Sequence, residues 1–156
     1  MIGPVLKVPF YKQKHGYSCG PACLRMVLEY WGLAVSEDEL VELSETTELG
    51  TDRFKLVEAA LKVGLEADTF LGISLEEVDK AIRDGLPIIA LIDPSELYGG
   101  IAGVGHFVVI IGLKKDAVFY HDPAMGDHLS IARETFERAW REFDCRGIRV
   151  WKPTKR

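Results

Sequence analysis

The stretch QKHGYSCGPACLRMVLEYWG, residues 13–32, decides how we expect the chain to fold. Pro21 suits the first turn of a helix, where the N–H that proline lacks would have no partner in any case. Ser18 or Gly20 can serve as the N-cap, and Gly32 suits the position just past the C-terminus. The pattern therefore predicts a helix that begins near Pro21 and ends before Gly32.

The charges in this helix are confined to one narrow stripe. Between Pro21 and Gly32 only Arg25 and Glu29 are charged, and residues four apart share one side of a helix. The remaining residues are apolar or aromatic, which indicates a helix surrounded by core on most sides. Cys19 comes just before it, where free N–H groups and the helix dipole favour a negatively charged sulfur.

The composition indicates a globular protein with one hydrophobic core. The chain has 156 residues, which suffices for one domain and is short for two. Its formal net charge of −5 argues against a nucleic-acid-binding surface, and no apolar run is long enough to span a membrane. The N-terminus lacks the basic start and cleavage site of a signal peptide. An odd number of cysteines favours free thiols in a reducing compartment, so we expect a cytoplasmic protein.

Capping signals predict three more helices, so the first half of the chain is expected to be helical. Ser36 with Glu39, and Ser74 with Glu77, form capping boxes that open two of them. Thr51 is the expected cap of the helix between those two. The predicted bounds are residues 36–43, 51–64 and 74–85. The apolar residues expected to face the core from the middle helix are Phe54, Leu56, Val57, Ala60 and Leu61.

The second half changes to strand periodicity. Continuous apolar runs such as LPIIALID and HFVVIIGL are typical of strands buried on both faces. A glycine-rich loop, residues 93–105, separates these runs, and it is either a mobile flap or a long turn. The predicted strands are residues 86–93, 106–113, 117–121, 128–131 and 147–151, with an amphipathic helix at 133–143. The sequence thus predicts an α+β fold, with a buried central helix starting at Cys19 and a C-terminal antiparallel β-sheet.

Cys19 has suitable partners for nucleophilic catalysis elsewhere in the chain. A thiol nucleophile needs a base and a group that orients this base. His106 begins a predicted strand directly after the glycine-rich loop, a position from which a side chain can face a cleft. Asp122 ends the neighbouring strand of the predicted hairpin, so we expect it beside His106. Gln13 can donate an amide N–H to an oxyanion, together with the Cys19 N–H.

Each of these residues also has an ordinary structural alternative. Cysteine is more often a small buried apolar residue than a nucleophile, and we expect that role for Cys23 and Cys145. His106 can be a hydrogen-bonded core histidine, Asp122 a turn residue and Gln13 an ordinary loop residue.

A metal centre is the least favoured use of these residue types. A zinc site built from Cys19, Cys23 and two histidines is conceivable, but CxxxC is not a typical zinc spacing. The remaining histidines, His15, His121 and His128, are expected at the surface or in turns. We therefore expect neither a metal nor an organic cofactor.

Three separated segments together point to a known family. They are Gln13 with CGPACL at residues 19–24 and Met26, GHFVVIIG at residues 105–112, and HDPA at residues 121–124. In this order they resemble the C39-type cysteine peptidases, papain-like domains that remove double-glycine leader peptides from bacteriocin precursors. Phe136 and Trp140 match a weaker C-terminal helix, so the resemblance covers nearly the whole chain.

The resemblance implies a papain-like fold, a single C39-like peptidase domain over residues 1–156, and a peptide or leader-peptide substrate. By position, Cys19 is then the nucleophile, His106 the general base, Asp122 its orienter and Gln13 the oxyanion donor. Cleavage after small residues such as Gly-Gly is also implied. The best-known members are the front domains of membrane transporters, whereas no transmembrane or ATPase segment follows in this sequence.

Two other functions remain open at this point. Some transporter-linked relatives have lost the cysteine and only hold substrate, which would make this chain a non-catalytic peptide-binding module. An acyl or peptidyl transferase would use the same acyl-enzyme as a peptidase with a different acceptor. Neither the natural substrate nor the oligomeric state follows from the sequence.

Overall fold

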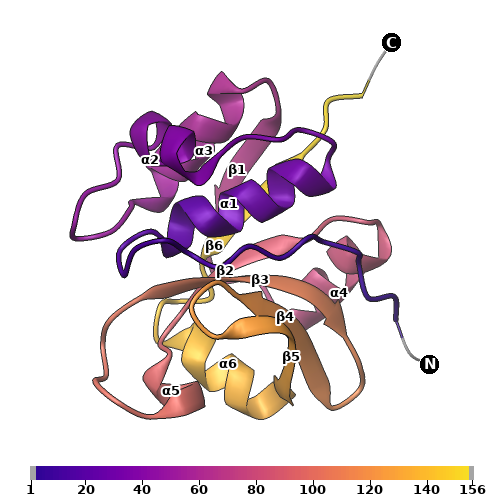
Figure 1. Cartoon of the computed structure of the whole chain (residues 1–156). Helices are drawn as coiled ribbons and strands as arrows, with labels where there is room; N and C mark the ends of the chain where they lie inside the picture. The colour runs from indigo at the N-terminus through magenta and orange to yellow at the C-terminus, as the bar shows by residue number, and fades with distance from the viewer. Residues whose placement is uncertain (1–2, 155–156) are drawn as a thin grey trace.

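A six-stranded antiparallel sheet separates two groups of helices in the computed structural model, which describes residues 3–154 (Figure 1). The longest helix has 12 residues, and no helix in this part of the chain has the length and apolarity needed to cross a membrane. The helices are α1 (Cys19–Tyr30), α2 (Glu37–Leu43), α3 (Arg53–Lys62), α4 (Leu75–Arg83), α5 (Ser95–Tyr98) and α6 (Arg133–Arg141). The strands are β1 (Glu66–Phe70), β2 (Ile88–Ile92), β3 (His106–Leu113), β4 (Ala117–Asp122), β5 (Gly126–Ala132) and β6 (Gly147–Trp151).

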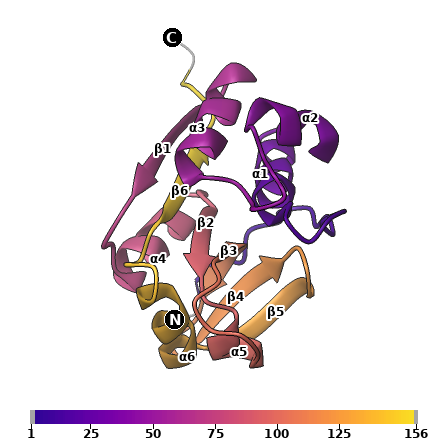
Figure 2. The ribbon, with the colours of Figure 1, turned by 90° about the vertical axis from the view of Figure 1, so that its left-hand side faces the viewer.

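The strands follow the order β1-β6-β2-β3-β4-β5 across the sheet. Strands β2 to β5 form a meander, while β6 returns to lie between β2 and β1, so the sheet is antiparallel as predicted but is not a simple meander. In Figure 2 it runs from β1 at the upper left to β5 at the lower right. The pairing of β4 with β5 shifts between Tyr120 and Asp122, so β4 is irregular where it ends.

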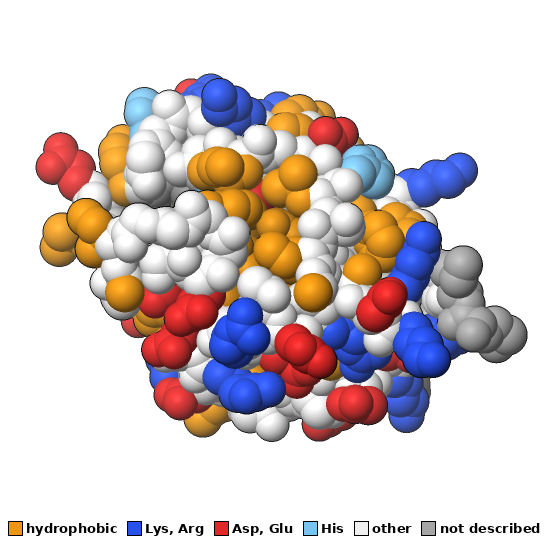
Figure 3. All heavy atoms as spheres, turned by 90° about the horizontal axis from the view of Figure 1, so that it is seen from below, with side chains coloured by type: hydrophobic (Ala, Val, Ile, Leu, Met, Phe, Trp, Pro, Cys, Tyr) orange, Lys and Arg blue, Asp and Glu red, His pale blue; other side chains and the backbone are white. Residues whose placement is uncertain are grey.

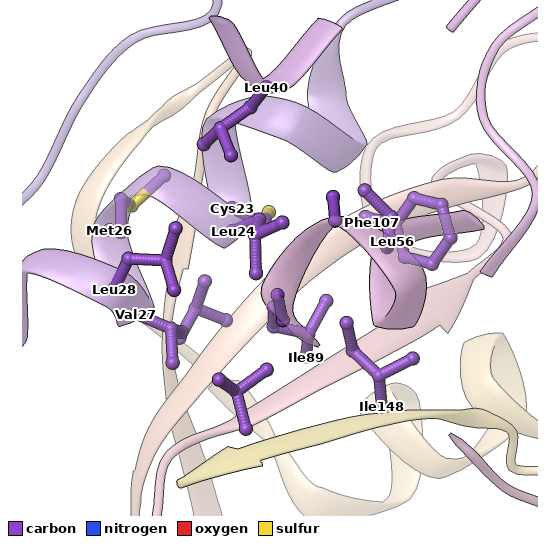
Figure 4. Close-up of a cluster of buried hydrophobic side chains, with 14 of the residues drawn as sticks. Cys23, Leu24, Met26, Val27, Leu28, Leu40, Leu56, Ile89, Phe107 and Ile148 are labelled. Carbon is purple, nitrogen blue, oxygen red and sulfur yellow. The ribbon is translucent and has the colours of Figure 1, made fainter. Parts of the chain in front are cut away.

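Alternate residues of the central strands enter two separate cores. From β3, Phe107 and Val109 face α1, α2 and α3, whereas Val108 and Ile110 face α4 and α6. This division explains why the strand reads as one continuous apolar run, because both of its faces are covered. Figure 4 shows the first core, in which side chains of α1 point toward Ile89, Phe107 and Ile148 of the sheet and Leu56 of α3.

The central helix forms as predicted. It starts at Cys19, with Ser18 as its N-cap residue, and Gly32 follows its end with a φ of 91°. The Ser18 hydroxyl does not cap the helix. It accepts a hydrogen bond from His15 N and donates one to the His15 carbonyl, both at 3.0 Å, so Ser18 closes the loop that leads to Cys19.

Some predictions for the first half are wrong. Asp52, not Thr51, caps α3 by accepting a hydrogen bond from Phe54 N at 2.7 Å. Phe54 and Leu61 are about half exposed rather than in the core, and Ala59 is buried instead. Strand β1 was not predicted, because its sequence EADTF has no apolar run.

Strand β1 is held in place by β6. All five of its residues pair with β6, and the Asp68 carboxylate receives two hydrogen bonds of 2.9 Å from the Arg149 guanidinium. Such a fork pairs both oxygens of the carboxylate at once. Cross-strand contacts of this kind, made to a segment 81 residues away, are not visible as periodicity in the β1 sequence.

A buried histidine ties the N-terminal segment to β4. His121 was expected at the surface or in a turn, but its exposed fraction is zero. Its Nδ1 accepts a hydrogen bond from His128 N at 3.0 Å, so Nε2 carries the proton and donates to the Val8 carbonyl at 2.7 Å. Burial lowers the pKa of His121 despite the opposing effect of the Val8 carbonyl, and the ring is therefore neutral.

We predict that this histidine makes the fold acid-sensitive. The depressed pKa of His121 means that its stabilising effect is present above its unfolded pKa of about 6.5 and is lost as the pH falls below that value. The free energy of unfolding should then fall between pH 6.5 and 5 by at most about 1.4 kcal/mol per pH unit. Urea titrations at several pH values measure this slope.

His121→Gln should reduce the slope, whereas the matched change His15→Gln, at an exposed histidine, should leave it in place. An unchanged slope in His121→Gln would show that another group causes the acid sensitivity.

Candidate active site

The start of α1 presents Cys19 in the lining of a cleft. The residue is partly exposed, and within residues 3–154 its backbone N–H makes no hydrogen bond. This cleft has a volume of about 290 Å³ and is lined by Cys19 together with Gly50, Arg53, Gly105 and Phe107. Free N–H groups at a helix N-terminus are suited to binding negatively charged oxygen.

The predicted pair of His106 and Asp122 is present. The His106 ring donates from Nε2 to Asp122 Oδ1 over 2.6 Å, and the same oxygen accepts a bond from Ala124 N at 2.9 Å. The Asp122 side chain is fully buried, whereas that of His106 retains 14% exposure. Because Nε2 is engaged, Nδ1 is the ring nitrogen that remains for Cys19.

The electrostatics of the pair favour a charged imidazolium at neutral pH. Burial alone lowers the pKa of His106, but the hydrogen bond and charge of Asp122 and the nearby Cys19 sulfur raise it to about 10. For Asp122 burial acts in the opposite direction and raises the pKa. The combined effect of His106, Ala124 N and Tyr98 is larger, so the pKa of Asp122 is lowered overall. A proton on His106 opposite Cys19 is the arrangement that stabilises a thiolate.

Gln13 lies in a loop tied to the same region. Its backbone N–H donates to the Pro123 carbonyl at 2.9 Å, directly after Asp122 in the sequence. Its side-chain Nε2 donates to the His15 carbonyl at 2.6 Å, and Oε1 is buried without a partner among residues 3–154. An amide nitrogen has two hydrogens, so one donor of Nε2 remains. The role of Gln13 as an oxyanion donor stays a prediction.

The glycine-rich loop contributes a residue that the sequence did not reveal. Tyr98, at the end of α5, donates its hydroxyl hydrogen to Asp122 Oδ2 at 2.8 Å and also contacts the Tyr120 hydroxyl at 2.8 Å. The short helix was missed because four residues are too few to show a helical pattern.

The base of this loop is fixed by a buried carboxylate. Asp93 is 2% exposed, and its oxygens accept hydrogen bonds from Ser95 N, Ser95 Oγ and Gly103 N at 2.7–3.0 Å. These bonds hold both ends of residues 93–103 together. They favour an anchored turn over a freely mobile flap.

The other cysteines lie as follows. Cys23 is fully buried, as predicted, and burial raises the pKa of its thiol well above its usual value, so it is a poor nucleophile. Cys145 is partly exposed rather than buried, and all three cysteines are free. Within residues 3–154 no group of three or more His, Cys, Asp or Glu side chains is arranged to hold a metal ion.

Known proteins match this chain over most of its length. Residues 7–144 match the sequence model of the Peptidase C39 family. An uncharacterized protein of Methanothermobacter marburgensis is 35% identical over 127 residues, which are 81% of this chain and 79% of that protein. The lactococcin-G-processing and transport ATP-binding protein LagD of Lactococcus lactis is 31% identical over 128 residues, which are 82% of this chain but only 17% of LagD.

Solved structures share the fold. A protein described as a C39-like peptidase, from Bacillus anthracis, has a TM-score of 0.81 at 21% identity, covering 97% of this chain and 98% of its own. A double glycine motif protease from an AMS/PCAT transporter, solved with its leader peptide, has a TM-score of 0.71 at 29% identity, covering 96% and 94%. The prediction of a papain-like α+β fold is confirmed.

We predict that Asp122 is needed to keep His106 charged at neutral pH. The raised pKa means that His106 holds its proton through neutral pH. The stability that it contributes is fully present below its unfolded pKa of about 6.5 and is lost as the pH rises from there through about 10. In Asp122→Asn the lowering effect of burial is no longer offset by a carboxylate, so the pKa should fall by more than about 2 units.

An NMR titration of the ring nitrogens measures both values, with exposed His15 as the internal control. A pKa of His106 that stays near 10 in Asp122→Asn would contradict this account of the pair.

Proposed function

The chain belongs to the peptidase C39 family, and on this premise we propose that it is a cysteine peptidase with Cys19 as its nucleophile. The observation that carries the proposal is the 2.6 Å bond between His106 and a fully buried Asp122, beside a partly exposed cysteine at a helix N-terminus. If His106 were only a core histidine and Asp122 only a turn residue, neither would need a partly exposed cysteine beside the pair. The arrangement meets the requirements for an activated thiol.

The proposed reaction proceeds through an acyl-enzyme. The Cys19 thiolate attacks the carbonyl carbon of a peptide bond, and the carbonyl oxygen becomes an oxyanion held by the Cys19 N–H and the remaining N–H of Gln13 Nε2. His106 gives its proton to the leaving amine as the C–N bond breaks, which leaves Cys19 acylated. Water then donates a proton to neutral His106 and attacks the thioester, releasing the acid and restoring the charged pair.

The shape of the cleft supports substrates with small side chains. Two glycines, Gly50 and Gly105, are among the residues that line it. A Cβ at Gly105 would lie 3.0 Å from Leu91 Cδ1 and 3.3 Å from the Phe143 ring, so a larger residue would not fit at this position without a shift of its neighbours. Cleavage after Gly-Gly is consistent with these glycines in the lining and with the double glycine motif protease among the similar structures.

The transport activity of relatives such as LagD does not carry over by similarity, because this chain spans 17% of that protein. A peptidyl transferase would share every step up to the acyl-enzyme, and trapping with an added amine distinguishes it by an amide product. A purely binding module would not require the charged partner that His106 provides.

We predict that proteolysis requires Cys19 and depends strongly on Gln13. Cys19→Ala should abolish cleavage of a peptide containing Gly-Gly, and Gln13→Ala should lower kcat by about 100-fold, which is typical for the loss of one oxyanion donor. Cys145→Ala removes a partly exposed thiol outside the cleft and is the matched control that should cleave normally.

A peptide series with Gly-Gly, Ala-Ala and Leu-Leu before the scissile bond, analysed by mass spectrometry, measures both rate and specificity. Cleavage that survives in Cys19→Ala would overturn the proposal. Equal rates for Gly-Gly and Leu-Leu would overturn only the specificity for small residues.

A further inference from the structure

We propose that Tyr98 is a positioning residue that holds the Asp122 carboxylate in the orientation in which it binds His106. This inference rests on the proposed function, because it assigns Tyr98 a role in the same catalytic pair. The hydroxyl does not touch the reacting atoms and acts through Asp122 alone. The role falls to a residue of the glycine-rich loop, whose purpose the sequence left open.

The two oxygens of Asp122 are held very differently. Oδ1 has two donors, His106 Nε2 at 2.6 Å and Ala124 N at 2.9 Å. Oδ2 has one donor among residues 3–154, the Tyr98 hydroxyl at 2.8 Å. The carboxylate is fully buried, and a buried charged oxygen without a donor carries a high desolvation cost. Tyr98 therefore fixes the half of the carboxylate that the backbone and His106 leave free.

The direction of the hydrogen bonds follows from counting protons. A tyrosine hydroxyl has one hydrogen, and Tyr98 donates it to Asp122. The Tyr120 hydroxyl, 2.8 Å from that of Tyr98, must then be the donor in their contact. Burial, the Tyr120 bond and the Asp122 charge all raise the pKa of Tyr98, so it keeps its proton. The result is a directed chain from Tyr120 through Tyr98 to Asp122 and His106, in which each bond polarises the next.

Two features of the fold bring Tyr98 to this position, the hydrogen bonds of Asp93 and the short helix α5. Asp93 fastens the start of the loop, and α5 then carries Tyr98 one helical turn further, over the end of β4. Tyr120 emerges two residues before Asp122 in the same strand, so both side chains lie on one face of the sheet. Tyr98 is 39% exposed overall, yet its hydroxyl points inward to these partners.

The surroundings increase the importance of this bond. Tyr98 lines a small, largely apolar hollow of about 150 Å³ together with Pro94, His106, Asp122 and Met125. Figure 3, which views the molecule from below Figure 1, shows apolar side chains gathered at the centre of this side of the protein. Electrostatic interactions are stronger where water is scarce, so one donor has a large effect on the carboxylate.

The proposed catalytic cycle defines when Tyr98 matters most. Once His106 has given its proton to the leaving amine, its ring is neutral and attracts Asp122 less strongly. Asp122 remains a carboxylate at this stage, and the Tyr98 hydrogen bond keeps its charge stabilised and its orientation fixed. No proton leaves Tyr98, so the tyrosine is unchanged over a turnover.

The test compares alkylation of Cys19 by iodoacetamide between pH 5 and 7, which needs no knowledge of the natural substrate. We expect Tyr98→Phe to lower the rate about tenfold, in line with the loss of one hydrogen bond to a charged group. Tyr30→Phe is the matched control. It removes a hydroxyl that donates to the Gly85 carbonyl at 2.6 Å, at the far end of α1, and should leave the rate unchanged.

A double-mutant cycle separates positioning from a general loss of structure. In an Asp122→Ala background, Tyr98→Phe should have no further effect on the rate, measured at a pH where residual alkylation still exceeds that of an unfolded control. A tenfold loss that persists without Asp122 would overturn the inference, because Tyr98 would then act by another route.

An NMR measurement on the folded variant gives a second, independent reading. The His106 Nε2–H proton should resonate far downfield in the unsubstituted protein and shift upfield or broaden in Tyr98→Phe but not in Tyr30→Phe. If Cys19 is activated and neither the rate nor this resonance changes in Tyr98→Phe, the inference fails alone. If Cys19 of the unsubstituted protein reacts as an ordinary thiol, both the inference and the proposed peptidase function fail.

Discussion

The burial of the Asp122 carboxylate is the constraint on which the rest of this site depends. A negative charge with no exposed surface is tolerated only when donors surround it, and here they come from a strand, a turn and a loop helix. Strand β3 supplies His106, the turn after β4 supplies Ala124 N, and α5 supplies Tyr98. The irregular end of β4 and the anchored glycine-rich loop are therefore parts of one arrangement, which keeps His106 protonated beside Cys19.

The position of Cys19 is determined by a different set of contacts, the apolar packing that buries α1. The helix is apolar on nearly every side because α2, α3 and the sheet all pack around it, and its N-terminus has little freedom to move. The loop before it is closed by Ser18 and His15 and joined to Pro123 by Gln13 N. The proposed nucleophile, Cys19, and its proposed base, His106, thus belong to different layers of the fold, and packing between these layers sets their separation.

Much of this could be predicted because the signals were strong and local. The apolar runs gave the bounds of β3 to within a residue, and the position of Cys19 before Pro21 gave the start of the site. His106 and Asp122 were placed together because a short hairpin leaves few alternatives. The family motifs then strengthened an assignment that already followed from position.

The features that could not be predicted from the sequence depend on contacts between residues far apart in the chain. Strand β1 is stabilised by β6, α5 has too few residues for a periodic signal, and Tyr98 meets Asp122 across 24 residues. His121 was misassigned for the same reason. Its partners are Val8 and His128 N, and nothing near it in sequence shows that the N-terminal segment covers it.

The misassigned histidine shows how the two layers are joined at the site. His121 and Asp122 are neighbours in β4, so their side chains lie on opposite faces of the sheet. Asp122 contacts Tyr98 and His106, whereas His121 holds the segment that leads through Val8 to the loop of Gln13. The end of one strand therefore fixes both the Asp122 carboxylate and the approach of the loop that contains Gln13. Protonation of His121 would place a hydrogen on Nδ1 and break the bond that it accepts from His128 N, while leaving the contacts of Asp122 intact. The two functions of the strand end are therefore physically separable.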